Sequence, residues 1–262
     1  MAGEIREHYD SLAFVYRTFW GDHIHHGLFV DGDSPARAQV RLVEHCVELL
    51  GGVAGRNVLD VGCGNGATAV YLAKQHGCRV LGITISEKQA QIACEQAARS
   101  GVKDRVAVVA ENAETFAYLA EKFDLVWTME SSEHFADKLA YFRNVERTLR
   151  GDGRLLLSAW TGDMASSGIQ GVAKRFLCPE LWTRGKYESA IKSSGLTIRA
   201  SEDLTPNVMR TWEICRERAR AAAVAVRLLP RAAREFVEGI DVIIDAYRSG
   251  ELTYIVLVAG KQ

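Results

Sequence analysis

The sequence lacks several features that would place it in a specialised class of protein. No apolar run approaches the ~20 residues that a membrane-spanning helix requires. The six cysteines show neither close pairing nor zinc-site spacing, so we expect reduced thiols. The net charge is only −1, so no overall field favours nucleic acid or an anionic membrane. The first ten residues are polar and contain no signal-peptide core. We therefore expect a cytoplasmic protein without a membrane span and without bound nucleic acid.

The composition is that of an ordinary globular protein. The chain has 262 residues, of which 48% are hydrophobic and 25% are charged, and this balance excludes intrinsic disorder. Its length suits one α/β domain with an appendage, or two small domains. The local motifs must therefore indicate the function.

One stretch, from Val58 to Gly66, combines the features of a nucleotide-binding turn. An apolar run typical of a buried strand ends in Asp60-x-Gly-x-Gly-x-Gly, and the next residues favour a helix. Glycine allows positive φ and close approach of a ligand, while the helix N-terminus presents unpaired N–H groups and a positive dipole potential. Gly62, Gly64 and Gly66 are one residue apart, unlike the Gly-x-Gly-x-x-Gly of dinucleotide-binding loops. This spacing suits a ligand built from an amino acid and a nucleoside.

The same nine residues resemble motif I of class I S-adenosylmethionine-dependent methyltransferases. The resemblance implies an α/β, Rossmann-like fold with a seven-stranded, mostly parallel sheet and an antiparallel last strand. It also implies S-adenosyl-L-methionine (SAM) as cofactor and S-adenosyl-L-homocysteine (SAH) as product. The cofactor contacts that it assigns to this stretch are Asp60, Gly62, Cys63, Gly64 and Gly66.

Apolar periodicity and turn residues predict the remaining elements. Strands are expected at 57–61, 79–84, 105–110, 123–128, 155–159, 196–203 and 254–260, and helices at 35–50, 67–76, 87–100, 137–149, 183–194, 207–229 and 232–249. Residues 161–182, which contain several glycines, are expected to form a loop that covers a ligand. The chain then divides into an N-terminal helix with a cofactor-covering loop (1–34), a SAM-binding core (35–160), and a last part (161–262) that completes the sheet and carries a helical lid at about 203–250.

Aromatic residues of the N-terminal helix have two interpretations. Tyr9, Tyr16 and Trp20 recur near helical spacing. They either pack on the core or line the ligand site. In the second case, Tyr9 and Tyr16 contact the cofactor, whose sulfonium is attracted to aromatic faces, and Trp20 contacts the substrate.

Three histidines follow in the loop, at His23, His25 and His26. Imidazole is a common metal ligand, but near-adjacent histidines on a loop rarely converge on one ion, and we expect no metal. Tyr9-Asp10 followed by Trp20-Gly-Asp-His-x-His-His-Gly27 resembles the N-terminal segment of γ-tocopherol methyltransferase-like enzymes. That group includes tocopherol C-methylating enzymes and alkaloid N-methyltransferases. The loop is therefore expected to cover the cofactor, with His26 as a substrate contact.

The second predicted strand ends without the acidic residue that usually accepts hydrogen bonds from both ribose hydroxyls of the cofactor. The chain has Gly82-Ile-Thr-Ile-Ser86 instead, which resembles the Gly-Ile-Thr-Leu-Ser version of the tocopherol group and of cyclopropane fatty acid synthases. Hydroxyl and amide groups can still pair with a diol. The resemblance assigns the ribose edge to Thr84, Ile85, Ser86 and Gln89. Ser86 is also suited to cap the helix at 87–100, and both roles are compatible.

Residues after the third and fourth predicted strands complete the expected cofactor site. Asn112 and Ala113 stand where the family contacts adenine, with Asn112 in place of the usual aspartate. Its carbonyl oxygen can accept from the adenine amine, with less charge assistance. Met129 is assigned to the cofactor as well.

Two carboxylates and an imidazole follow the fourth predicted strand at Glu130, Glu133 and His134. Functional groups of open α/β sheets gather at the carboxyl ends of strands. The arrangement resembles the acidic-histidine cluster of tocopherol and coclaurine-type N-methyltransferases. This implies that Glu133 and His134 orient the acceptor or take its proton, while Glu130 supports them or the methionine end of the cofactor. Alternatively, Glu133 only begins the next helix, where an early carboxylate is favourable.

Large aromatic residues predict an enclosed, largely apolar acceptor site. Besides Trp20 and His26, the candidate substrate contacts are Trp160, Phe176, Trp182 and Trp212. Such a site favours a small organic molecule over a protein side chain or a nucleic-acid base. The arginines between 216 and 234 could suggest an anionic partner, but interspersed glutamates favour a solvated face.

Together these patterns predict a SAM-dependent methyltransferase of the tocopherol group. It would move a methyl group by SN2 displacement to a C, N or O atom of a small, largely apolar or aromatic metabolite or amine of natural-product type. We expect a monomer or homodimer. One alternative is methylene transfer to a lipid alkene, suggested by the Gly-Ile-Thr-Ile-Ser segment. Another is a non-catalytic SAM-binding module that serves as a partner or sensor.

Overall fold

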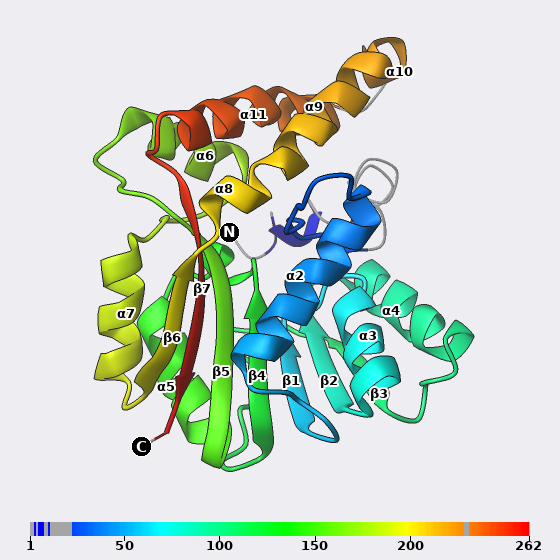
Figure 1. The fold of residues 1–262 in the computed structure, drawn as a ribbon, viewed down its shortest axis with the longest axis vertical. Coiled ribbons are helices and arrows are strands. Elements are labelled where there is room, and N and C mark those ends of the chain that lie inside the picture. Colours follow the sequence, from blue (N-terminus) through cyan, green and yellow to red (C-terminus); the bar gives the residue numbers. More distant parts are fainter. Residues whose placement is uncertain (1–2, 4, 8–9, 11–22, 228–230, 262) are drawn as a thin grey trace.

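A seven-stranded sheet forms the centre of the molecule (Figure 1). The structure, a computed structural model, describes residues 3, 5–7, 10, 23–227 and 231–261. Across the sheet the strands are ordered β3-β2-β1-β4-β5-β7-β6. Their bounds are β1 Asn57–Val61, β2 Arg79–Thr84, β3 Val106–Ala110, β4 Phe123–Met129, β5 Leu149–Thr161, β6 Thr197–Asp203 and β7 Thr253–Gly260. The last strand, β7, runs antiparallel to both β5 and β6, while β1 to β5 pair in parallel. The predicted mostly parallel sheet with an antiparallel last strand is confirmed.

Helices cover both faces of this sheet. The bounds are α2 Pro35–Leu49, α3 Ala67–His76, α4 Glu87–Arg99, α5 Lys138–Thr148, α6 Ser167–Arg175, α7 Arg184–Ser193, α8 Thr205–Val208, α9 Arg210–Ala221, α10 Ala223–Arg227 and α11 Arg231–Arg248, with a 3₁₀ turn η1 at Ser132–His134. Along β1, Val58 packs in the apolar cluster of α2, α3 and α4, whereas Leu59 and Val61 pack in that of α5 and α7. Because successive side chains of a strand point to opposite faces, a strand covered on both sides carries apolar residues that point in both directions.

Serine caps begin two helices next to the sheet. The Ser34 hydroxyl accepts from the N–H of Arg37 at the start of α2. The Ser86 hydroxyl accepts from the N–H of Gln89 at 3.0 Å, which confirms the predicted capping of α4. The caps satisfy N–H groups that have no partner within the helix. The end of β2 is thereby joined firmly to α4.

The expectation of a loop at 161–182 is wrong, because this stretch contains α6. The Ser166 hydroxyl accepts from the N–H groups of Gly168 and Ile169 and caps the helix. Ile169 and Val172 are buried on the face that meets α11. The glycine content indicated a loop, but the cap and the three-residue spacing of buried side chains determine a helix.

The single long helix expected at 207–229 is also wrong, because three shorter helices, α8, α9 and α10, occupy its described part. The chain leaves helical geometry at Ala222, with φ −99° and ψ 21°. Alanine favours helix, so the sequence carries no local signal for this break. With α6 and α11, these helices lie above the end of the sheet at which β4 ends (Figure 1).

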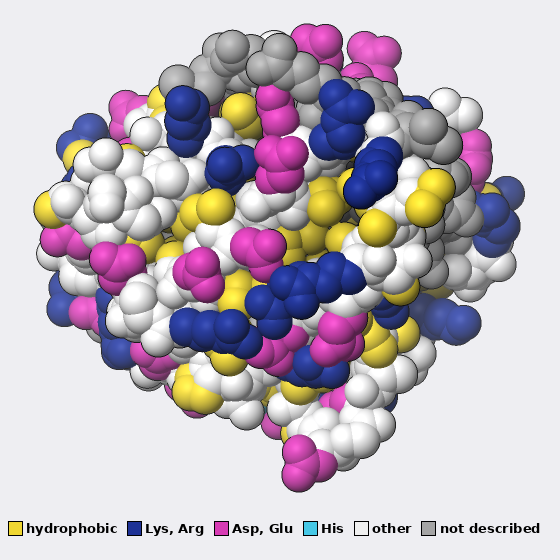
Figure 2. All heavy atoms as spheres, turned by 90° about the horizontal axis from the view of Figure 1, so that it is seen from above, with side chains coloured by type: hydrophobic (Ala, Val, Ile, Leu, Met, Phe, Trp, Pro, Cys, Tyr) yellow, Lys and Arg dark blue, Asp and Glu magenta, His cyan; other side chains and the backbone are white. Residues whose placement is uncertain are grey.

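The surface of these helices carries interspersed charges of both signs. Arg210 forms ion pairs with Glu213 and Glu217, and Arg248 forms one with Glu213. Figure 2 looks onto this end of the molecule and shows Lys and Arg mixed with Asp and Glu. This agrees with the predicted solvated face. Among the described helices, none has the length and apolarity needed to cross a membrane.

Candidate active site

The turn after β1 requires glycine for two reasons. Gly62 has φ +76°, and a Cβ there would lie 2.3 Å from the Cβ of Ser131. Gly66 has φ +78°, and a Cβ there would lie 2.6 Å from that of Ala93 in α4. L-residues rarely adopt such φ values. The turn therefore packs tightly between α4 and the residues after β4. The side of its backbone that does not meet these elements faces open space.

That space consists of two adjoining cavities with Ile24, Gly62, Gly64 and Met129 in both linings. The larger has an empty volume of about 770 Å³, part of which is open to solvent. The predicted cofactor residues that line it are Gly62, Gly64, Thr84, Ile85, Gln89, Asn112, Ala113 and Met129. The smaller is lined by Asp60, Cys63 and Asn65 among others. Gly66 and Ser86 line neither cavity and instead support the turn and the helix behind it. The other three predicted contacts lie outside the described residues: Tyr9, Tyr16 and Trp20.

Buried acceptors without partners border the smaller cavity. Asp60 is 3% exposed, and its Oδ2 has no hydrogen-bond partner among the described residues. The same holds for Oδ1 of Asn65. Burial raises the pKa of Asp60 to about 7. Because buried polar atoms are costly unless hydrogen-bonded, the two oxygens fit a ligand donor such as the ammonium group of an amino acid.

The larger cavity presents neutral polar groups. The hydroxyl of Thr84 donates to Oε1 of Gln89 at 2.7 Å, which fixes the amide beside the turn. The Oδ1 of Asn112 already accepts from the N–H of Glu114 at 2.9 Å. A carbonyl oxygen has a second lone pair, so the predicted contact of Asn112 with an adenine amine remains compatible with this bond.

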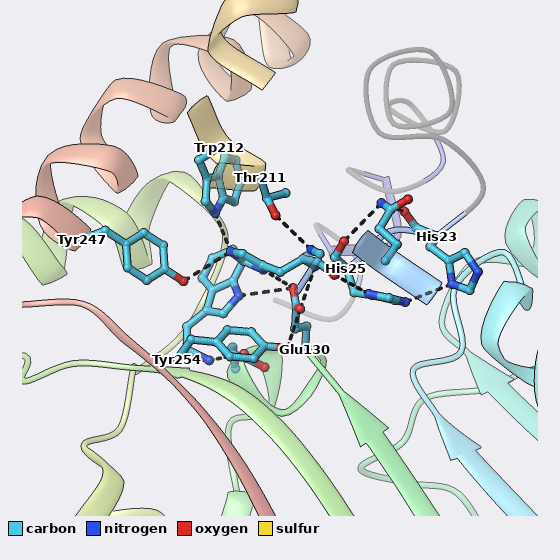
Figure 3. Close-up of polar contacts among 12 residues, drawn as sticks. His23, His25, Glu130, Thr211, Trp212, Tyr247 and Tyr254 are labelled. Atoms are coloured by element: carbon cyan, nitrogen blue, oxygen red, sulfur yellow. Dashed lines mark hydrogen bonds and ion pairs between the residues drawn. The ribbon is translucent and has the colours of Figure 1, made fainter. Parts of the chain in front are cut away.

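Glu130 lies at the centre of a buried polar network that reaches from the sheet to the helices above it (Figure 3). Its Oε1 accepts from the backbone N–H of His26 and the hydroxyl of Tyr254, both at 2.8 Å. Its Oε2 accepts from Nδ1 of His26 at 2.7 Å and from the indole of Trp160 at 3.3 Å. On the other side of the imidazole, Nε2 of His26 accepts from the indole of Trp212 at 2.7 Å. The network therefore joins His26 to Glu130, although the two residues are 104 positions apart in the sequence.

The contacts of Glu130 keep it ionised. Burial would raise the pKa of its carboxyl, but the hydrogen bonds that it accepts, two of them from His26, outweigh burial and hold the pKa below its usual value. Each oxygen already accepts two hydrogen bonds. In this arrangement Glu130 has no lone pair directed at a proton of another molecule, so the geometry favours a binding or positioning role.

Glu133 and His134 occupy η1 but differ in access to the cavities. Glu133 is fully buried and lines neither cavity; Oε1 accepts from the N–H of Trp160 at 2.7 Å, and Oε2 has no partner among the described residues. Burial raises the pKa of Glu133 to about 8. His134 lines the larger cavity, and its Nδ1 donates to the carbonyl of Leu177 at 3.2 Å. Burial lowers the pKa of His134 to about 4, so its imidazole is neutral at physiological pH.

The predicted substrate residues are brought together only in part. The rings of His26, Trp160, Phe176 and Trp212 pack edge to face, with centroids 5.2–5.8 Å apart. They line neither cavity and form an apolar wall beyond Glu130. Trp182 lies apart from them, with its ring 5.4 Å from that of Tyr187.

The histidine loop is held by bonds within the protein. Nδ1 of His25 donates to the carbonyl of His26 at 2.7 Å, so Nε2 of His25 is the acceptor for Nδ1 of His23 at 2.9 Å (Figure 3). His23 and His25 line the smaller cavity. Among the described residues, no group of three potential ligands is arranged to hold a metal ion.

Comparison with known proteins decides the family of the chain. The family model described as mycolic acid cyclopropane synthetase matches residues 1–238. The chain belongs to this family.

Proteins similar in sequence to this chain include methyltransferases. The 27-O-demethylrifamycin SV methyltransferase of Amycolatopsis mediterranei is 31% identical over 221 residues, which cover 82% of this chain and 81% of that protein. The chloroplastic tocopherol O-methyltransferase of Arabidopsis thaliana is 28% identical over an alignment 285 residues long, which covers 98% of this chain and 81% of that protein. The mycolic acid cyclopropane synthase CmaA1, solved with SAH and CTAB, has a TM-score of 0.89 at 21% identity, over 99% of this chain and 98% of that chain.

These findings confirm three predictions for this member of the cyclopropane synthetase family. The fold is that of the Rossmann-like class I methyltransferases, as the superposition shows. The protein is a SAM-dependent methyltransferase, and its sequence is similar to that of the tocopherol enzyme, as the motifs indicated. The unpartnered acceptors beside the glycine turn are consistent with this cofactor.

Sequence reasoning missed two tyrosines in the site of this family member. Tyr254 of β7 donates to Glu130, and the hydroxyl of Tyr247 of α11 lies 3.3 Å from Nε2 of His26. In the sequence both stand in apolar runs and read as core residues. The one available signal was general, because a buried tyrosine hydroxyl usually has a hydrogen-bond partner.

The network predicts that Trp212→Phe destabilises the protein by about 1–3 kcal/mol more than the matched variant Trp182→Phe. Both changes remove an indole, but only the first leaves a buried acceptor, Nε2 of His26, without its indole donor. The indole of Trp182 donates to Glu180, whose side chain is 45% exposed, so water can replace it. Urea unfolding of the two variants measures the difference. Equal losses of stability would contradict the proposed importance of the His26 contact.

Proposed function

We propose that this methyltransferase acts on a small, largely apolar or aromatic metabolite or an amine, and methylates a carbon, nitrogen or oxygen atom. The two adjoining cavities are the main observation behind this proposal. Acceptor atoms of Asp60 and Asn65 without a partner among the described residues border the smaller cavity, and the imidazole of His134 borders the larger. The rifamycin and tocopherol names of two relatives support an organic acceptor. The aromatic wall of His26, Trp160, Phe176 and Trp212 supports an apolar environment near it.

The cavities suggest how the chain holds its cofactor. We assign the amino-acid end to the smaller cavity, where Asp60 and Asn65 can accept from an ammonium group. The larger cavity would hold the nucleoside, with Thr84, Ile85 and Gln89 toward the ribose and Asn112 and Ala113 toward the adenine. Bound SAM supplies an electrophilic methyl group for SN2 displacement. Because the cofactor carries the chemistry, the protein contributes mainly by aligning the two reactants.

His134 is our candidate for removing a proton from the acceptor. It lines the larger cavity, and its Nδ1 is used as a donor to Leu177, so Nε2 is the nitrogen that can accept. Glu133 lies behind it and, with a pKa of about 8, is mostly protonated at pH 7. We assign Glu133 the role of orienting η1 through its bond to the backbone of Trp160.

We expect His134→Asn to lower kcat by about 10²–10⁴-fold for a phenol acceptor, as is typical of a lost general base. A tertiary amine has no proton to lose, so the same variant should lower its kcat less than about tenfold. Because its pKa is near 4, His134 stays neutral between pH 6 and 8, so its titration should not lower the wild-type kcat in this pH range. Steady-state kinetics measure both effects. His45→Asn, which removes a histidine paired with Glu202 away from both cavities, is the control.

Production of SAH by the purified protein, offered a panel of phenols, amines and indoles, tests the proposed function. Turnover of at least one acceptor is the expected result. Tight binding of SAH with no turnover on any acceptor would favour the alternative of a non-catalytic SAM-binding module. Untargeted comparison of metabolites from cells with and without the gene would narrow the acceptor class.

A second candidate is methylene transfer to a lipid alkene, favoured by the match to the cyclopropane synthetase family model. A monounsaturated acyl substrate with SAM distinguishes the two. Methylene and methyl products both gain a CH₂ unit, so mass alone cannot separate them. Cyclopropane protons in the NMR spectrum of the product would establish the second candidate.

The organisation of the chain follows from this proposal. We divide it into a cofactor-covering segment (1–34), a SAM-binding core (35–160) and a last part (161–262), with a lid at about 203–250. The position of α9 and α11 above the carboxyl end of β4 supports the lid (Figure 1). We further propose that the protein is cytoplasmic, is a monomer or homodimer and does not bind nucleic acid; the interspersed surface charges support the last of these.

A further inference from the structure

Glu130 is a buried carboxylate that accepts hydrogen bonds but, among the described residues, meets no lysine or arginine. Its side chain is 6% exposed, and its contacts come from a backbone N–H, an imidazole, an indole and a hydroxyl. Among the described residues, no lysine or arginine forms an ion pair with it. An isolated buried charge is costly, and such charges are normally paired.

The imidazole of His26 does not supply the missing cation. An indole nitrogen can only donate, so the 2.7 Å contact from Trp212 makes Nε2 of His26 an acceptor. The proton of His26 then lies on Nδ1, which donates to Glu130. This is the neutral form of histidine. Within the described part of the chain, the negative charge of Glu130 is therefore stabilised by neutral donors and is not cancelled by a cation.

Glu130 is placed where a ligand charge would meet it. It lines the larger cavity and directly follows Met129, which lines both cavities. Two other buried carboxyls nearby, Asp60 and Glu133, have pKa values raised by burial to about 7 and 8. Of these three, Glu130 is the one that carries a full charge at neutral pH.

We infer that Glu130 is the counter-charge for the cationic centre of the cofactor and makes this site prefer SAM over SAH. The inference rests on the proposed cofactor site. SAM carries a positive sulfonium, whereas SAH carries a neutral thioether at the same atom, so the difference in affinity reports on charge. The preference would favour release of the product after each methyl transfer.

Calorimetric titration without acceptor tests this role, with SAM, SAH and sinefungin, which carries an ammonium in place of the sulfonium. For the wild type we expect both cations to bind on the order of tenfold more tightly than SAH, as for a charge pair partly screened by its surroundings. In Glu130→Gln the preference should fall below about twofold, through weaker binding of the cations. Glu111→Gln removes an exposed carboxylate from the same cavity lining and should leave the preference unchanged.

The outcomes separate this inference from other roles. If Glu130 only held His26 and Tyr254 in place, Glu130→Gln would weaken all three ligands equally, and the inference would be wrong. SAH binding as tightly as both cations to the wild type would overturn it without any variant, so a failure of Glu130→Gln to fold does not prevent a decision. Tyr254→Phe, which keeps the charge and removes one donor, should retain the preference. If none of the ligands binds, the proposed cofactor site itself fails.

Discussion

Gly62→Ala is expected to weaken SAH binding more than about 100-fold and to destabilise the fold by about 2–5 kcal/mol. The added Cβ would lie 2.3 Å from the Cβ and 2.7 Å from the Oγ of Ser131. Ser131 cannot easily move, because its hydroxyl donates to the carbonyl of Val61 at 2.8 Å. The residues after β4 would therefore be pushed away from the turn, and both cavities would change shape. Titration with SAH and unfolding in urea measure the two effects.

Gly52→Ala is the control that separates backbone strain from this overlap. Gly52 has φ +95°, but a Cβ at this position would have no atom within 4 Å. The variant should lose only the ~1 kcal/mol expected for a side chain at positive φ and keep SAH affinity. Binding of SAH to Gly62→Ala within threefold of the wild type would show that the turn does not hold the cofactor.

Asp60→Asn is expected to weaken SAH binding by about 10–100-fold at pH 8 and to remove its pH dependence. An ammonium ligand stabilises the ionised carboxylate, but the pKa of Asp60 without ligand is about 7. Binding below pH 7 must therefore release a proton. Wild-type affinity should be flat above pH 7 and fall by up to tenfold per pH unit below it. Titrations from pH 5.5 to 8.5 measure this slope, and an unchanged slope in the variant would contradict the assignment.

The same change should make the protein without ligand more stable at pH 8. Burial raises the folded-state pKa of Asp60 from 3.8 to about 7. The folded protein then holds a proton that the unfolded chain has lost, so the contribution of Asp60 to stability is lost as pH rises from about 4 to 7. Asparagine does not titrate and avoids this loss. If Asp60→Asn is more stable than the wild type but binds SAH more weakly, Asp60 serves ligand binding at a cost in stability.

The sequence identified those parts of the site that lie close together in the chain. The strand, glycine turn and helix at 57–76 follow from local rules, because φ, helix capping and apolar alternation depend on near neighbours. Residues after β2, β3 and β4 line one cavity, as expected of parallel strands that end at one edge of a sheet, but Glu133 after β4 does not reach it. Where local composition was ambiguous, as for the glycines of α6, the prediction was wrong.

By itself, then, the sequence determined the methyltransferase fold, its cofactor and the identity of the turn that frames the cavities. Only the tertiary structure decided how Glu130, Glu133 and His134 differ: Glu130 and His134 line the larger cavity, with Glu130 saturated by donors, whereas Glu133 is buried away from it. It also brought Trp212 to His26 across 186 residues. The physical reason is that ionisation and hydrogen bonding depend on burial and on which groups meet in space, and these contacts come from segments that are remote in the chain.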